Sequence, residues 1–258
     1  MKKESTLLFF VQRIAICFFL SISVFVQSQT QQSGLSADRL RVWKDMIYDN
    51  NIYVSAYFGH GSYSMNGMRR LSKDIVRLSG LNATVNSDFP PFWLYGVSVS
   101  QTYDDHQFGF NLESMSTGAR SSISDYSGLY VSDFICSGYK LGVFIEKDLS
   151  YKINTIKELS FGYRLEAGSL ASKILYKSQV TVYNMDQGTL TDEFGFISAT
   201  TYIEPAVFAN WKLDKKTFIQ FSTGFMLDLP SVLYIGTQSE YQIGWAGYRF
   251  RLGLLRQM

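Results

Sequence analysis

The chain has 258 residues, of which 24 are Lys or Arg and 22 are Asp or Glu, giving a formal net charge of +2. A charge so close to zero gives no reason to expect nucleic acid or an anionic surface as a partner. Two cysteines are too few for a disulfide framework, whereas aromatic residues make up 16% of the chain.

The first 28 residues have the pattern of a secretory signal peptide. A basic start, MKKESTLLFFVQR, precedes an uncharged run from Ile14 to Val26. This run is shorter than the ~20 residues of a membrane-spanning helix and matches the apolar core of a signal. We expect cleavage after Ser28, with an uncleaved membrane anchor as the alternative. Cleavage removes a net charge of +2 together with Cys17, so the mature chain is neutral and keeps Cys136.

Residues 29–50 begin polar and then place Leu35, Leu40, Trp43 and Ile47 at an irregular helix-like spacing. This pattern predicts an N-terminal leader that forms either a short periplasmic helix or a loose segment. We expect residues 51–258 to form one barrel domain, for the reasons that follow.

Eight segments after residue 50 alternate apolar and polar side chains, which is typical of β-strands. In chain order they are 51–62, 92–103, 106–116, 132–147, 157–170, 196–212, 217–229 and 243–255. Each has about the ~9–11 residues of a tilted membrane strand, and an even number suits a closed antiparallel sheet. The links after the second and sixth segments are tight. Those after the first, third, fifth and seventh are longer, as in barrels with short periplasmic turns and long outer loops.

One helix is expected inside the first outer loop, over residues 68–80. Met68, Leu71, Ile75 and Leu78 fall on one helical face, and Gly80 can end the helix. The helix either covers the mouth of the barrel or lies as an ordinary amphipathic helix on the surface.

The polar face of the strands decides which side of the sheet points inward. In SFGYRLEAG (160–168), Arg164 and Glu166 alternate with apolar residues. The sequence offers no second layer to cover the apolar face of eight strands, so we expect that face to meet lipid and the charged face to line a lumen. The expected lumenal charge network comprises Glu113, Lys140, Glu146, Arg164, Glu166, Glu204, Arg249 and Arg251.

Buried charges require partners, so we expect the three arginines of this network to pair with Glu113, Glu166 and Glu204. A channel lining is the alternative, although eight strands leave a narrow bore. Aromatic residues near strand ends, namely Trp93, Tyr95, Tyr139 and Trp211, fit an interfacial girdle and weigh against a soluble lipocalin-type cup. The fold class is therefore all-β, an eight-stranded antiparallel up-and-down transmembrane β-barrel.

Three stretches carry a resemblance to known proteins. STGARSSISDYSG (116–128), followed by GYKLGVFIE (138–146), resembles a strand–loop–strand segment of small outer-membrane barrel proteins of Bacteroidota, and GSYSMNGMRRL (61–71) resembles their first loop. The whole barrel resembles, more loosely, the OmpA/OmpX-type eight-stranded fold. The resemblance implies architecture and carries no assigned activity.

Catalytic signals are sparse. His60 and Ser62 stand two residues apart near the end of the first strand, and their spacing is similar to that in outer-membrane lipid A deacylases. Two residues along a strand separate side chains by about 7 Å, so a nucleophile–base hydrogen bond is not completed by this pair alone. The sequence contains no Cys/His cluster for a metal and no phosphate-binding glycine loop, so we expect no metal and no cofactor.

These observations predict a non-enzymatic protein of the bacterial outer membrane with a structural or interaction role in adhesion or envelope integrity. The alternatives are a narrow pore for small solutes and a lipid A-modifying acyl hydrolase. The expected partners are outer-membrane lipid and lipopolysaccharide, the barrel assembly machinery during insertion, and an extracellular ligand at the outer loops.

Overall fold

The computed structural model describes residues 52–78, 83–103, 105–124, 126–149, 159–183, 189–229, 231–235 and 239–258. The expected signal peptide (1–28) and leader (29–50) lie outside the described residues. Residues Asn51–Met258 form one unit of the chain.

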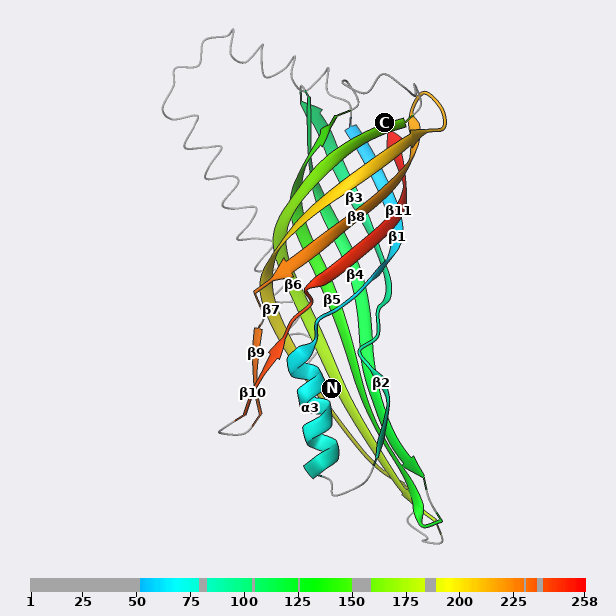
Figure 1. Cartoon of the computed structure of the whole chain (residues 1–258), viewed down its shortest axis with the longest axis vertical. Helices are drawn as coiled ribbons and strands as arrows, with labels where there is room; N and C mark the ends of the chain where they lie inside the picture. Colours follow the sequence, from blue (N-terminus) through cyan, green and yellow to red (C-terminus); the bar gives the residue numbers. More distant parts are fainter. Residues whose placement is uncertain are drawn as a thin grey trace, which may run out of the picture. The chain divides into compact units, whose positions relative to one another are not determined.

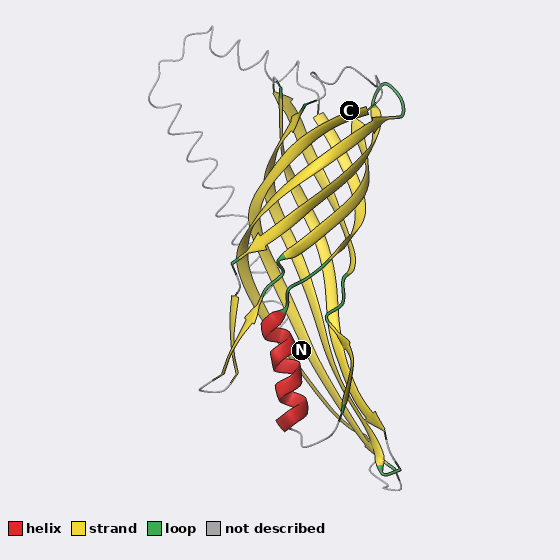
Figure 2. Ribbon diagram, viewed as in Figure 1, coloured by secondary structure: helices red, strands yellow, loops and turns green. Residues whose placement is uncertain are grey.

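Eight strands close into a ring (Figures 1 and 2). In ring order they are β1 (Ile52–Gly61), β3 (Phe92–Tyr103), β4 (His106–Ser124), β5 (Gly128–Asp148), β6 (Leu159–Val182), β7 (Thr189–Lys212), β8 (Thr217–Asp228) and β11 (Gly247–Gln257). Every neighbouring pair is antiparallel, and β11 pairs with β1 to close the sheet. The predicted eight-stranded antiparallel up-and-down barrel is confirmed.

The remaining elements belong to the two longest links. The link between β1 and β3 carries α3 (Asn66–Leu78) and β2 (Thr84–Asp88), and β2 pairs with β4. The link between β8 and β11 carries the hairpin of β9 (Ser231–Ile235) and β10 (Ser239–Ile243). The helix predicted over 68–80 is confirmed, displaced by two residues. Neither it nor any other helix of the described part of the chain is long and apolar enough to span a membrane.

The two ends of the barrel differ. β1 begins and β11 ends at one end, which is called the terminal end here. β3 ends and β4 begins at this end, as do β5 and β6, and β7 and β8. The opposite end, called the far end, carries α3, β2 and the β9–β10 hairpin (Figure 1).

The long outer loops predicted after the third and fifth segments are wrong, because strand continues through most of both. Continuous pairing joins β4 to β5 out to Ser124 and Leu129, and β6 to β7 out to Thr181 and Thr189. Four strands, β4 to β7, therefore extend past the others at the far end (Figure 2).

Small polar residues made the first of these extensions resemble a loop in the sequence. The alternation of faces nevertheless persists through it, and Arg120 on β4 pairs with Asp133 on β5 through two hydrogen bonds of 2.6 and 2.7 Å. Side chains that disfavour an isolated strand are tolerated where both neighbouring strands are present.

The pairing of β7 with β8 is interrupted in the middle of the wall. The ladder runs through Tyr202 and Ile203 and resumes at Ala206, leaving out Glu204 and Pro205. Proline has no N–H to donate to the adjacent strand, which accounts for the gap at this position.

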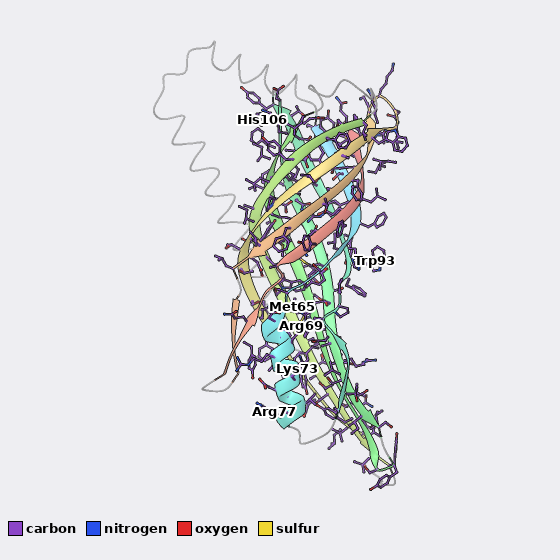
Figure 3. The ribbon with its side chains drawn as sticks, viewed as in Figure 1. Met65, Arg69, Lys73, Arg77, Trp93 and His106 are labelled. Atoms are coloured by element: carbon purple, nitrogen blue, oxygen red, sulfur yellow. The ribbon has the colours of Figure 1, made fainter. Side chains whose placement is uncertain are left out.

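The two faces of the wall carry the chemistry predicted from the alternation. Apolar side chains such as Val97, Phe110, Val207 and Phe221 are about half exposed on the outside. The inside holds eight buried charged side chains of the strands, together with Ser55, Ser98 and other small polar residues. The apolar face of this closed sheet therefore has no protein layer over it among the described residues (Figure 3).

Candidate functional site

The interior of the barrel is the most chemically distinctive region of the protein. The buried charged side chains of the described residues are the eight predicted for the lumen, four glutamates and four cations. They come from β4, β5, β6, β7 and β11. They can meet because residues paired across adjacent antiparallel strands point to the same face of the sheet at the same height.

Lys140 lies at the centre of this network. Its Nζ is 2.6 Å from Glu204 Oε2, 3.0 Å from Glu166 Oε1 and 3.5 Å from Glu113 Oε1. The lysine is 1% exposed. A single buried cation thus pairs with three carboxylates from three different strands.

Two arginines complete the pairing of the glutamates. Arg251 Nε donates to Glu113 Oε2 at 2.7 Å, and its Nη1 donates to Glu204 Oε1. Arg164 Nη2 donates to Glu166 Oε2 at 2.6 Å, and its Nη1 donates to Glu146 Oε1 at 3.0 Å. Each of the four carboxylates therefore has at least one cationic partner.

Arg249 departs from the expected pairing with a glutamate. It is fully buried but forms no ion pair among the described residues, and it donates instead to the backbone carbonyls of Ser62 and Trp245 at 2.6 and 2.8 Å. Its guanidinium also lies over the ring of Tyr63. The reason is its position two residues nearer the far end than Arg251, where backbone carbonyls of the links replace carboxylates as acceptors.

Neutral side chains connect the charges, and these were missed as site residues from the sequence. Asn111 Nδ2 and the Tyr202 hydroxyl donate to Glu166 at 3.0 and 2.7 Å, and the Tyr57 hydroxyl donates to Glu113 at 3.0 Å. The alternation of the strands could have identified them, because each stands at an inward position of its strand, on the same face as the charged residues.

An apolar plug lies between this network and the far end. Its core is Met65, Met68, Leu71, Ile243 and Trp245, all buried against the inner wall. This supports the covering role expected for the helix: α3 buries its apolar face in the plug, beside β10 and β4, while Arg70 and Arg77 remain exposed. Figure 3 places Arg69, Lys73 and Arg77 along α3.

Trp245 pins the plug to the wall. Its indole N–H donates to Ser172 Oγ on β6 at 2.8 Å, and its backbone N–H donates to Asp228 Oδ2 at the end of β8 at 2.7 Å. A Cβ at Gly138 would approach this ring to 3.2 Å, so the glycine leaves room for it. Sequence reasoning assigned Trp245 to the eighth strand and gave it no role.

The two catalytic candidates do not meet. The exposed His60 ring lies edge-on to Trp93 at a centroid distance of 5.7 Å, whereas the Ser62 hydroxyl accepts a hydrogen bond from the Tyr248 N–H. No hydrogen bond joins the two side chains within the described part of the chain. His60 therefore does not act as a base for Ser62 in this geometry.

The four aromatic residues expected at membrane interfaces are all exposed on the outside of the wall. Trp93, Tyr95 and Tyr139 lie toward the far end of the ring, and Trp211 lies at the terminal end of β7. No group of three or more His, Cys, Asp or Glu side chains suited to a metal occurs among the described residues, and Cys136 is buried in the wall.

Comparisons with known proteins yield solved structures only. No family model and no curated protein matches the sequence. Neisserial surface protein A is 11% identical, with 80% of this chain and 97% of that chain covered and a TM-score of 0.39. The outer membrane protein OprG from Pseudomonas aeruginosa is 10% identical, with 81% and 96% covered and a TM-score of 0.43.

The N-terminal β-barrel domain of Pseudomonas aeruginosa OprF is 11% identical, with 81% of this chain and 98% of that chain covered and a TM-score of 0.33. At these identities the similarity concerns the fold alone. The assignment of an eight-stranded barrel rests on the continuous strand pairing of this chain.

Proposed function

We propose that this protein is an outer-membrane β-barrel with a closed lumen that displays an extended sheet outside the cell for binding to another protein. The inverted pattern of the wall supports the location: charges are buried and paired inside, while apolar side chains are exposed outside. Only lipid makes such a surface favourable, because water would penalise the exposed apolar band. The terminal end then faces the periplasm and the far end faces outward.

The observation that carries the binding role is an open sheet edge at the far end. β2 covers the edge of β4 by pairing Thr84–Asp88 with residues 119–122. The other edge of the extended sheet is β7. β9 lies beside part of β7 without pairing with it, and no strand of the described residues pairs with residues 189–201 on that side. An unpaired edge is a template for strand addition by another chain.

The backbone groups along this edge point away from β6. The Thr201 carbonyl accepts a hydrogen bond from Leu229 N–H at 3.0 Å, on the side opposite β6. Because backbone groups alternate in direction along a strand, residues 191, 193, 195, 197 and 199 also present their N–H and C=O groups to the open edge.

An aromatic row leads across the inner face of the sheet to this edge. Ring centroids are separated by 6.4 Å from Phe89 to Phe134, 4.8 Å to Tyr176 and 4.6 Å to Phe194. Phe194 is 42% exposed on β7 itself, and Leu190 is 73% exposed. The partner we propose is therefore an extended segment with apolar side chains at alternate positions, since these would fall beside the row.

Gly195 offers a matched test of this proposal. A Cβ there meets no atom closer than 3.5 Å, so a larger residue fits without disturbing β6. Gly195→Pro removes one N–H from the open edge, whereas Gly195→Ala keeps it. Peptides selected from a displayed library against the protein in lipid nanodiscs are expected to bind wild type and Gly195→Ala alike and to bind Gly195→Pro at least tenfold more weakly, a loss of ~1.4 kcal/mol.

Both variants should still migrate faster on gels before boiling than after it, which reports an intact barrel. If the selected peptides bind Gly195→Pro as tightly as wild type, they do not bind by pairing with the open edge of β7, and the proposal is wrong. Peptides without an alternating apolar pattern would exclude strand addition beside the aromatic row.

The other functions considered from the sequence receive less support. A pore would require a passage through both the paired charges and the plug, and a hydrolase would require His60 and Ser62 to meet. Bacteroidota origin, contact with lipopolysaccharide and recognition by the barrel assembly machinery stay predictions from the sequence.

A further inference from the structure

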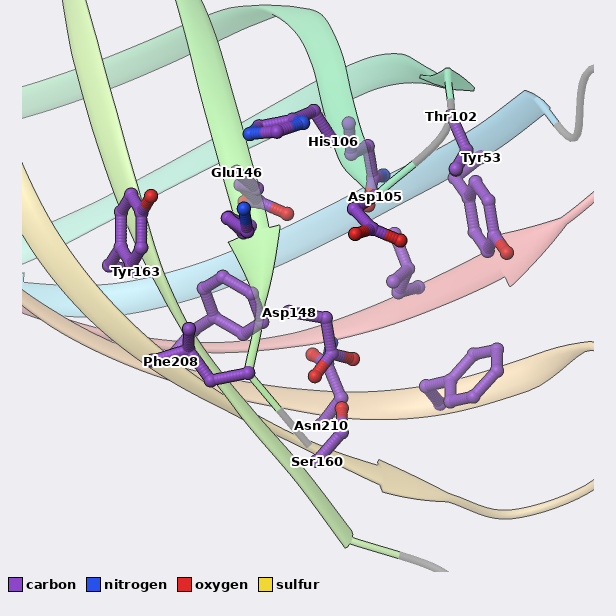
Figure 4. Close-up of a pocket in the computed structure, with 15 residues that line it drawn as sticks. Tyr53, Thr102, Asp105, His106, Glu146, Asp148, Ser160, Tyr163, Phe208 and Asn210 are labelled. Carbon is purple, nitrogen blue, oxygen red and sulfur yellow. The ribbon is translucent and has the colours of Figure 1, made fainter. Parts of the chain in front are cut away.

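The barrel has a second chemically distinct region at its terminal end, separate from the open edge of β7. A cavity of about 950 Å³ opens there, and Glu146 is the one member of the charge network that lines it. Figure 4 shows the side chains that line it. They come from β1 and from β3 to β8, with Leu255 from β11, so all eight strands of the ring contribute to the cavity.

Carboxylates dominate the charged groups of this cavity. Glu146 forms part of the inner boundary and is 3% exposed, with Asp105 and Asp148 near the opening. The one lysine in the lining, Lys147, stands at an outward position of β5, next to two inward acids. His106 is the other basic residue of the lining.

The walls between the carboxylates are aromatic and apolar. Tyr53, Phe208, Phe218 and Leu255 all stand at inward positions around the ring. Aromatic faces near carboxylates attract cations that carry apolar groups. The face of the ring and the carboxylate both attract positive charge, and the ring also packs against the apolar part.

An unsatisfied acceptor in the lining is a separate observation. The Oδ1 atom of Asn210 is buried and has no hydrogen-bond partner among the described residues. A buried acceptor without a donor is unfavourable, and an N–H from a bound molecule would relieve it.

We propose that this cavity binds an alkylammonium or guanidinium group that enters from the periplasm. Asp105 and Asp148 provide the attraction at the opening, the aromatic walls receive the aliphatic part, and Asn210 accepts an N–H. The group could be carried by a free amine or by a Lys or Arg side chain of a periplasmic protein, since both present the same chemistry.

Calorimetry on the full-length mature protein in detergent tests this proposal with three probes. 1,5-Diaminopentane represents the free amine, an acetylated tripeptide with a central lysine represents a protein side chain, and 1,5-pentanediol is a neutral analogue of the diamine. We expect one or both cationic probes to bind and the diol not to bind. The affinity should fall as NaCl is raised, because part of the attraction is between charges.

Asp105→Asn combined with Asp148→Asn is expected to weaken the binding of the cation at least tenfold. Asp214→Asn is the matched control, because Asp214 is an exposed carboxylate in the 213–216 link at the same end and does not line the cavity. It should change the affinity less than twofold. All variants are checked for the mobility shift on boiling.

Preference for the diamine identifies a free amine as the source, and preference for the tripeptide identifies a protein side chain. The proposal is overturned if neither cationic probe binds, if the diol binds as well as the diamine, or if the double variant binds like Asp214→Asn. A single Asp105→Asn variant, expected to weaken binding severalfold, keeps the test decisive if the double variant does not fold.

Discussion

Replacement of Lys140 by methionine is expected to destabilise the barrel strongly. The methionine retains most of the side-chain volume but leaves Glu113, Glu166 and Glu204 without the cation that lies within 3.5 Å of all three. Removing one partner of a buried ion pair costs about 3–5 kcal/mol, because the remaining charge stays in a region that solvates it poorly. Urea or guanidinium unfolding of the refolded protein in detergent, followed by tryptophan fluorescence, measures the loss.

Lys173→Met is the matched control for this prediction. Lys173 lies on the exposed face of β6, where the same substitution removes no buried partner. Adding Glu204→Gln to Lys140→Met should recover part of the stability, because it removes the negative charge of one of the three carboxylates that have lost this cation. Equal unfolding midpoints for Lys140→Met and Lys173→Met would contradict the assignment of Lys140 as the centre of the network.

Replacement of Trp245 by alanine is expected to release the plug while leaving the wall closed. The change removes a fully buried indole, its hydrogen bond to Ser172 and its contact with Tyr63. Truncating a buried tryptophan costs about 3–5 kcal/mol. Even 3 kcal/mol raises the population of locally opened plug by about 100-fold, since each 1.4 kcal/mol is a factor of ten.

Limited digestion with trypsin measures this opening. Arg70 and Arg77 are exposed on α3, but a helix is cleaved only when it opens locally. We expect cleavage within α3 to be much faster in Trp245→Ala than in Trp93→Ala, whose missing ring lies on the outside of the wall. Similar rates in the two variants would mean that Trp245 does not hold the plug.

The eight charged residues of the lumen could be identified from the sequence because a strand has a period of two. Once a strand is located, the positions of Arg164 and Glu166 relative to Leu165 follow from the backbone alone. The same period assigned Glu113, Lys140 and Glu204 to the inner face without any knowledge of their neighbours. The closed sheet followed from the absence of a second layer that could cover the apolar faces.

Which of these charges meet could not be read from the sequence. Partners are set by the register between strands and by the shear of the closed sheet, and neither is visible in one strand. Arg249 illustrates the difference: it shares its face with Arg251 but meets backbone carbonyls instead of a carboxylate. The far-end extension of β4 and β5 was missed for a related reason, because Ser- and Gly-rich strands depend on the strands at their sides.

The sequence by itself determined the class of fold, the number of strands in the ring, the helix in the first long link and the face to which the side chains of each predicted strand point. All of these depend on local backbone geometry and on the chemistry of successive residues. Only the tertiary structure decided the three-carboxylate contact of Lys140, the Trp245 pin, the open edge of β7 and the cavity at the terminal end. Each of these brings together residues distant in the chain, and their proximity arises from closing the sheet.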